Sequence, residues 1–147
     1  MLIKLLTLII DDKTFALDIT NIERVIPSVE ITILPELPEY LHGVINYQGN
    51  IIPVINNRKL FLLDHKEIEL TDMFIVVLSN SKYLCLISDS TDEIISCEDT
   101  EIVSTQNISQ NITLSKGMLK KDGKIVIIYD IDKFIGLEEY ELIEKRS

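Results

Sequence analysis

Two stretches of this 147-residue chain repeat each other, and the repeat limits the folds that the chain can adopt. The stretch GVINYQGNIIPVINNRKLF, which begins at Gly43, aligns without a gap with GMLKKDGKIVIIYDIDKFI, which begins at Gly117. The turn glycines Gly49 and Gly123 then coincide, and each copy passes from a hairpin pattern into a short helical pattern. A chain that carries this hairpin and helix twice is expected to form two similar small units.

A second, weaker repeat supports the first. The stretch FALDITNIERVI, from Phe15, matches LCLISDSTDEII, from Leu84, at an offset of 69 residues, close to the 74 residues of the first repeat. Chance similarity between β-hairpins is the alternative explanation. Two similar small barrels in one chain would explain both repeats.

The remaining pattern predicts an all-β fold with a few short helices. Short β-rich runs, separated by polar or glycine-containing turns, occupy residues 2–10, 15–17, 44–47, 51–55, 73–78, 83–87, 94–96 and 125–129. Many short strands at regular spacing indicate a sandwich or barrel rather than βαβ units. Short helices are expected at 57–62 and 130–135, with a last one at 138–145 that begins acidic and ends basic. The polar stretch 100–113 is expected to be a long mobile loop.

Charge and cysteine content exclude several classes of protein. The net charge of −10 disfavours nucleic acid and anionic lipid as partners, because both require basic surfaces. Cys85 and Cys97 lack metal-ligand spacing and are expected to be buried free thiols in a reducing cytosol. The apolar start of the chain reads as an opening strand, and no segment is long enough to span a membrane.

The residues that could carry chemistry do not form an active-site pattern. His42 and His65 are distant from the cysteines in sequence and are interpreted as solvated surface residues. No nucleophile elbow or phosphate-binding loop is present, so catalysis and cofactor binding are not expected. An acidic tract could hold a hard cation weakly, although a solvated face is the simpler interpretation; its members are Asp89, Asp92, Glu93, Glu98, Asp99 and Glu101.

The hairpin region resembles the CheW family of chemotaxis coupling proteins. The family pattern G-V-x-N-x-R-G-x-I-x-P-V-x-D-L-R follows a strand and a proline-rich linker, as it does here. The matching positions are Ile22, Val25, Pro35, Pro38, Gly43, Val44, Asn46, Gly49, Ile51, Pro53, Val54 and Arg58. The resemblance covers nearly the whole chain and implies one domain, residues 1–147, made of two intertwined five-stranded SH3-like barrels.

The resemblance also implies a function and a set of contact residues. CheW-like proteins are non-enzymatic cytoplasmic adaptors that join chemoreceptor tips to the regulatory domain of a CheA-type histidine kinase. The first barrel is expected to meet the kinase, and a groove between the barrels to take the receptor. The residues expected to contact partners are Ile22, Arg24, Val25, Gly43, Asn46, Gln48, Gly49, Val54 and Arg58.

Several positions depart from the family pattern. Arg24 stands where the family has Glu, Gln48 where it has Arg, and Asn56 where it has Asp, while Ser88 and Thr91 are polar at apolar groove positions. Two alternatives therefore stay open. One is a diverged CheW-like module in another kinase pathway, such as surface motility, and the other is a small divalent-metal enzyme that uses the acidic tract.

Two local geometries follow from the same stretch. Gln is poorly suited to positive φ, so the Gln48–Gly49 turn is expected to be a type I turn with Gly49 alone at positive φ. Pro53 lacks an N–H and is therefore expected on an edge strand or at a bulge, where the missing donor faces solvent.

Overall fold

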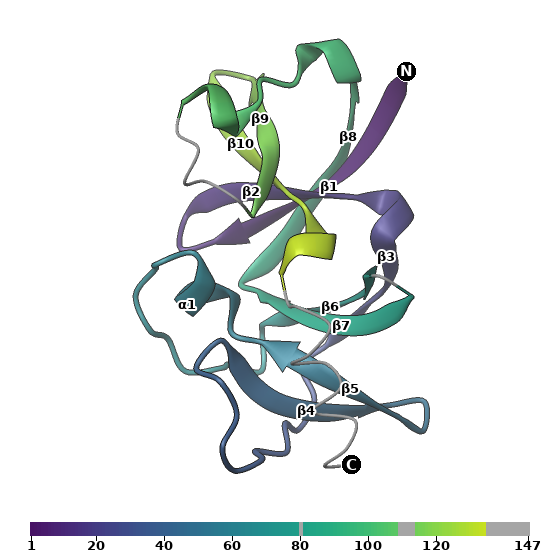
Figure 1. The fold of residues 1–147 in the computed structure, drawn as a ribbon, viewed down its shortest axis with the longest axis vertical. Coiled ribbons are helices and arrows are strands. Elements are labelled where there is room, and N and C mark those ends of the chain that lie inside the picture. Colours follow the sequence, from purple (N-terminus) through teal and green to yellow (C-terminus); the bar gives the residue numbers. More distant parts are fainter. Residues whose placement is uncertain (80, 109–113, 135–147) are drawn as a thin grey trace.

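The computed structural model describes residues 1–79, 81–108 and 114–134, and within them the chain forms two five-stranded sheets (Figure 1). One barrel uses both ends of the chain and is called the terminal barrel: β1 (Leu2–Ile10), β2 (Lys13–Asp18), β8 (Ser90–Glu98), β9 (Ser115–Lys121) and β10 (Lys124–Tyr129), in the order β8-β1-β2-β10-β9. The other is called the central barrel: β3 (Ile22–Pro27), β4 (Leu41–Tyr47), β5 (Asn50–Ile55), β6 (Met73–Ser79) and β7 (Lys82–Ser88), in the order β3-β6-β7-β5-β4.

Short helices connect the strands. They are α1 (Asn57–Leu60) and the 3-10 helices η1 (Ile19–Asn21), η2 (Asp99–Glu101), η3 (Thr105–Asn107) and η4 (Ile131–Lys133). None of the helices in the described ranges is long and apolar enough to cross a membrane. The helix expected at 138–145 lies outside the described residues.

The strand register confirms both sequence repeats. In the central barrel, the parallel pairing of β5 with β7 places Val54 opposite Cys85. In the terminal barrel, the parallel pairing of β10 with β2 places Ile128 opposite Ala16. These pairs are related by the 74- and 69-residue offsets read from the sequence. The barrels are therefore two copies of one unit, and β1 and β2 complete the copy that β8, β9 and β10 begin.

Each barrel closes through an equivalent contact beside a glycine. Thr32, in the segment after β3, forms an isolated bridge with Val44 in β4, and Val103, in the segment after β8, forms one with Met118 in β9. A Cβ atom on Gly43 would collide with the backbone oxygen of Thr32. Close backbone approach therefore requires glycine at this position.

Three apolar clusters hold the fold together. One fills the terminal barrel around Leu5 and Ile128, and one fills the central barrel around Val54 and Phe74. The third lies between the barrels and contains residues from both. Burial of each of these Val, Leu, Ile or Phe side chains contributes about 1.5–3 kcal/mol.

Aromatic rings cross the junction between the barrels. Phe61, just after α1, stacks on Tyr129 of β10 with ring centroids 4.0 Å apart, and Phe134 meets Tyr129 edge-on at 5.5 Å. Burial raises the pKa of the Tyr129 hydroxyl. The ring packing fixes one side of the junction.

Most predicted elements are present, with informative exceptions. Every predicted strand lies within an observed one. β3 was not predicted as a strand, and β9 was implied only by the hairpin pattern at Gly117, because charged residues interrupt the apolar pattern of both. The helix expected at 57–62 shortens to α1, and η4 occupies the described part of the helix expected at 130–135. The expected loop at 100–113 is partly structured, since η2, η3 and the Val103 bridge hold its described portion. Cys85 and Cys97 are buried and free, as expected.

The explanation expected for Pro53 is wrong. The β5 strand lies between β7 and β4, and Pro53 is buried. Val44, which lies opposite Pro53, makes its backbone hydrogen bonds to Thr32 on its other side. Pro53 therefore occupies a non-hydrogen-bonded pair of the antiparallel ladder, and β4 does not require its missing N–H.

Candidate partner-binding surface

The β4–β5 hairpin presents three of the predicted contact residues together. Asn46, Gln48 and Gly49 are all exposed at its tip, and the Asn46 side-chain oxygen accepts a hydrogen bond from the Gly49 N–H at 2.9 Å. Gln48 has φ 51° and Gly49 has φ 85°. Positive φ at both central residues makes this a type I′ turn, so the expected type I turn is wrong. Gln48 adopts positive φ, although Gln favours negative φ, because a tight two-residue connection between β4 and β5 requires it.

The β3 strand carries a second group of predicted residues, at the other end of the same sheet. Arg24 is exposed, and its guanidinium makes no ion pair with a described carboxylate. Ile22 and Val25 are half-buried and pack against the cluster between the barrels. Ile22 therefore contributes to the core as well as to the surface.

Two of the predicted contact residues are inside the protein. Val54 is fully buried, with 0% of its surface exposed, and belongs to the core of the central barrel. The expectation that Val54 contacts a partner is wrong, because residues 52–55 of β5 are all buried and both faces of the strand are covered there. Gly43 is also buried, and its close approach to Thr32 gives it a structural role.

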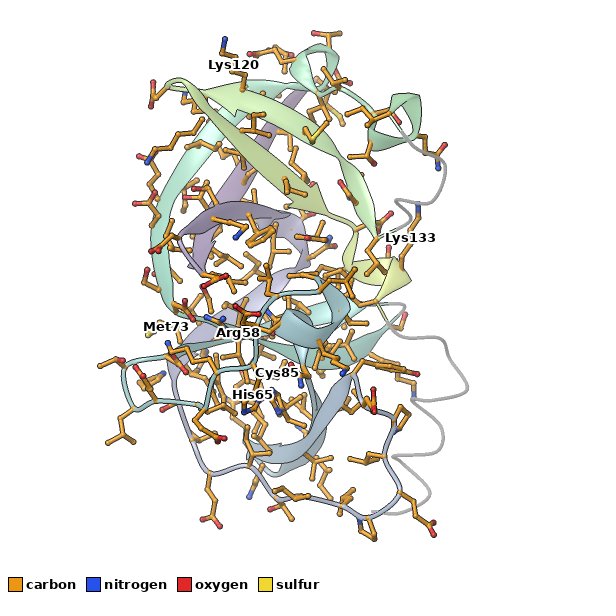
Figure 2. The ribbon with its side chains drawn as sticks, turned by 90° about the vertical axis from the view of Figure 1, so that its left-hand side faces the viewer. Arg58, His65, Met73, Cys85, Lys120 and Lys133 are labelled. Carbon is orange, nitrogen blue, oxygen red and sulfur yellow. The ribbon has the colours of Figure 1, made fainter. Side chains whose placement is uncertain are left out.

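Arg58 lies in the junction between the barrels (Figure 2). Its Nη2 donates hydrogen bonds to both carboxylate oxygens of Asp89, at 2.9 and 2.8 Å, and its Nη1 donates to the backbone oxygen of Asp64 at 3.2 Å. Asp89 is the residue between β7 of the central barrel and β8 of the terminal barrel. The backbone N–H of Asp11, in the β1–β2 turn, donates to Asp89 at 2.9 Å. One carboxylate thus connects α1, the inter-barrel link and the terminal barrel.

Lys66 extends this group of charges. Its ammonium nitrogen lies 3.5 Å from Asp89, 3.6 Å from Asp72 and 3.7 Å from Glu69. Asp72 is almost fully buried, and one of its oxygens accepts the Glu69 N–H at 2.8 Å. The other oxygen has no hydrogen-bond partner among the described residues and is compensated by the nearby ammonium.

The pKa values follow from these contacts. Burial raises the pKa of Asp89, but the Asp11 N–H and the Arg58 guanidinium lower it further, so the net pKa lies below the ordinary value. Burial lowers the pKa of Lys66, and the carboxylates of Asp89, Asp72 and Glu69 raise it more, so its net pKa lies above the ordinary value. Both shifts favour the charged forms of Asp89 and Lys66, so these two groups form a paired ionic network with their neighbours at the junction.

The histidines lie beside this network. His42 is half-buried rather than solvated, and burial followed by the neighbouring His65 lowers its pKa. A hollow of about 360 Å³ opens next to Arg58. Its lining residues are Glu39, Asn56, Arg58, Lys59, Leu63 and His65.

Sequence reasoning found Arg58 but missed its partner. Asp89 was assigned to an acidic tract, and the tract is not a cluster in space. Asp89 binds Arg58, while Glu98 and Asp99 pair with the N-terminal ammonium of Met1. In the part of the chain that the structure describes, no group of three or more His, Cys, Asp or Glu side chains could hold a metal ion. The divalent-metal alternative therefore loses the cluster on which it was based.

Comparison with known proteins identifies relatives of this architecture. A family model described as "CheW-like domain" matches residues 4–139. The chain is 33% identical over 127 residues to the chemotaxis protein CheW of Thermotoga maritima, covering 86% of this chain and 83% of that protein. It is 29% identical over 128 residues to CheW of Helicobacter pylori, covering 86% and 78%.

A solved structure has the same fold over nearly its full length. It is the crystal structure of the scaffolding protein TtCheW from Thermoanaerobacter tengcongensis, with a TM-score of 0.82 and 27% sequence identity. The alignment covers 92% of this chain and 98% of the other.

Proposed function

The chain belongs to the CheW-like domain family, and from this membership we propose that it is a non-enzymatic adaptor of chemotaxis signalling. In finer detail, it couples chemoreceptor tips to the regulatory domain of a CheA-type histidine kinase in the cytoplasm. The names of its relatives, which include chemotaxis proteins and a scaffolding protein, support this proposal.

The observation that carries the proposal is the presence of two separate exposed surfaces on one sheet. An adaptor must hold its partners in a fixed arrangement, and both surfaces belong to the β3-β6-β7-β5-β4 sheet of the central barrel, one at each end of the strand order. The Arg58–Asp89 pair and the apolar cluster between the barrels join this sheet to the terminal barrel. The exposed hairpin at Asn46, Gln48 and Gly49 is assigned to the kinase. The β3 strand at Ile22, Arg24 and Val25, which borders the packing between the barrels, is assigned to the receptor.

We further propose that both barrels act as one domain. The terminal barrel needs β1 and β2 from the start of the chain and β8, β9 and β10 from its second half. A cut before or after the central barrel would therefore leave the terminal barrel without part of its sheet.

A reconstitution with purified partners tests the proposal. The chain is mixed with a CheA-type kinase and a chemoreceptor from the same cell, and co-sedimentation and kinase autophosphorylation are measured. Receptor control of the kinase should require the chain. Gly49 is kept in all variants, so that the turn still forms. Gln48→Glu should weaken kinase binding, whereas Lys4→Gln, at an exposed position of β1, should not.

Two results would contradict the proposed function. If the chain binds neither the kinase nor the receptor, the coupling role is wrong. If it binds a kinase of another pathway, such as surface motility, and not the chemotaxis kinase, the diverged-module alternative replaces it.

A further inference from the structure

The β9–β10 hairpin carries an unusual density of positive charge for an acidic protein. Lys116, Lys120, Lys121 and Lys124 are all exposed on it, and Asp122 is the one acidic residue among them. None of the four lysines makes an ion pair with a carboxylate in the described ranges, although the chain has a net charge of −10. Some basic side chains elsewhere do have such partners; Lys59, for example, lies 3.4 Å from Glu39.

The arrangement of these lysines works against stability. Lys121 and Lys124 are directly opposite one another across the hairpin. Like charges in that relation destabilise a sheet. They line a hollow of about 100 Å³ that Asp92 and Glu93 also line, without an ion pair to either. Lys120 faces a different neighbour, since it lies opposite Ile125.

The central barrel provides an internal control. Its equivalent hairpin, β4–β5, has the same two-residue turn with positive φ at both positions. At the positions of the four lysines it has His42, Asn46, Tyr47 and Asn50. The fold therefore does not require a basic hairpin. Protection of an outer strand against unwanted pairing does not explain the lysines either, because β4 is also an outer strand and has none.

Apolar side chains accompany the charge. Ile125 is 65% exposed and Val103 is 53% exposed. Val103 lies opposite Met118 of β9 through the isolated bridge. Lys120, two residues after Met118 in β9, lies opposite Ile125 of β10. Alternation along β9 places Lys116, Met118 and Lys120 on one face, which Ile125 shares because it lies opposite Lys120, whereas Lys121 and Lys124 lie on the other face. Apolar and cationic groups therefore share the face of Lys120.

The surface is remote from the junction and from the hairpin of the central barrel. Figure 2 shows Lys120 at the outer end of the terminal barrel, pointing away from the body of the protein, with Arg58 and His65 far below it. It is therefore separate from the surface assigned to the kinase and the receptor.

From these observations we propose that this hairpin docks an acidic segment of a partner protein, in which carboxylates flank an apolar side chain. The site, called the lysine hairpin, consists of Lys116, Lys120, Val103 and Ile125 on one face of the hairpin. The carboxylates would pair with Lys116 and Lys120, and the apolar side chain would cover Ile125. Lys121 and Lys124, on the other face beside the turn, add to the positive potential around the site. A long polyanion fits less well, because the net charge of the whole protein repels it.

A binding titration with the full chain tests the proposal. The probe is a fluorescein-labelled synthetic peptide in which two leucines are flanked on each side by glutamates. The test variant replaces all four hairpin lysines by glutamine. Its charge-matched control replaces Lys4, Lys13, Lys59 and Lys82 by glutamine instead. The test variant should lose at least about tenfold in affinity, the control less than about twofold, and the affinity should fall as salt is added.

Further arms separate the components of the site. Ile125→Ser, or a peptide with serines in place of the leucines, should weaken binding several-fold. A DNA duplex and phosphatidylserine vesicles should bind more weakly than the acidic peptide. Thermal unfolding checks that the test variant is folded, and relief of the Lys121–Lys124 repulsion should leave its midpoint unchanged or higher.

The proposal is overturned by any of three results. The peptide does not bind the unmodified chain, the test variant and its control bind equally well, or DNA or vesicles bind as tightly as the peptide. Equal affinity of the leucine and serine peptides would remove the apolar part of the site.

Discussion

Arg58 holds both carboxylate oxygens of Asp89 from a single guanidinium nitrogen, at 2.9 and 2.8 Å, across the junction of the two barrels. The Arg58 side chain is 14% exposed and that of Asp89 26% exposed. Because water is largely excluded from the pair, neither charge can be removed without leaving its partner poorly solvated.

The first prediction concerns this pair. Arg58→Met should lower the free energy of unfolding by about 1–3 kcal/mol, because a partly buried carboxylate loses its charged hydrogen-bond donor. Urea denaturation with a constant m-value measures the change. Lys59→Gln is the matched control on the same helix. It breaks an exposed pair with Glu39 and should cost at most about 1 kcal/mol. Equal effects of the two substitutions would contradict a special role for the junction.

The second prediction follows from the depressed pKa of Asp89. Its folded-state pKa lies below the unfolded value, since Arg58 and the Asp11 N–H outweigh the effect of burial. Asp89 therefore contributes stability above its unfolded pKa of about 3.9, and this contribution is lost as the pH falls through the folded pKa. Unfolding free energies measured from neutral to acidic pH should converge for the wild type and Asp89→Asn at low pH. A constant difference across that range would show that the carboxylate charge is not responsible.

The third prediction separates two kinds of glycine. Gly49 has positive φ and open space where a Cβ would lie, so Gly49→Ala should cost only about 1–2 kcal/mol of backbone strain. Gly49→Asn should cost less, because Asn tolerates that conformation. At Gly117 the φ is not positive, but a Cβ would lie 2.5 Å from Ile102 Cγ2 and 2.7 Å from the Val103 oxygen.

Gly117→Ala must therefore displace the bridge that closes the terminal barrel, and Gly43→Ala the equivalent bridge of the central barrel. Both should destabilise the protein more than Gly49→Ala does, because the steric overlap alone costs about 1–3 kcal/mol or more. Thermal or urea unfolding of the three alanine variants gives the ranking. A ranking in which Gly49→Ala is the most damaging would contradict the closure role of Gly43 and Gly117.

The fourth prediction tests partner choice at β3 and the hairpin. Arg24 and Gln48 are both exposed, so the double change Arg24→Glu with Gln48→Arg should alter stability by no more than about 1 kcal/mol. It restores the family's charges and should weaken binding to this chain's own partners while strengthening binding to a conventional CheA–receptor assembly. Paired titrations with both sets of partners measure this. Unchanged affinity for both would mean that the departures from the family pattern are neutral.

Ile22 is unsuitable as a surface probe. Its half-buried side chain packs against the cluster between the barrels, so Ile22→Asp should lower the unfolding midpoint. Circular dichroism of the variant measures the midpoint, and an unchanged midpoint would show that Ile22 is not part of the core.

The sequence by itself determined the repeated unit, the strands with an apolar pattern and the family. Local alternation, turn glycines and short motifs carry this information, because side-chain periodicity reports which face of a strand is buried. The offsets at Gly43 and Phe15 relate the pair of Val54 with Cys85 to the pair of Ile128 with Ala16, but they do not say which strands pair.

Tertiary structure decided which strands pair, which contact residues face outward and where Arg58 finds its partner. The pairing of β1 with β8 and the approach of Asp89 to Arg58 join residues far apart in the chain, and no local pattern records such contacts. Val54 looked like an interface residue and is fully buried, because the position of a strand within its sheet determines what covers it. Gln48 likewise adopted positive φ, since the closed ladder of β4 and β5 outweighs the preference of one side chain.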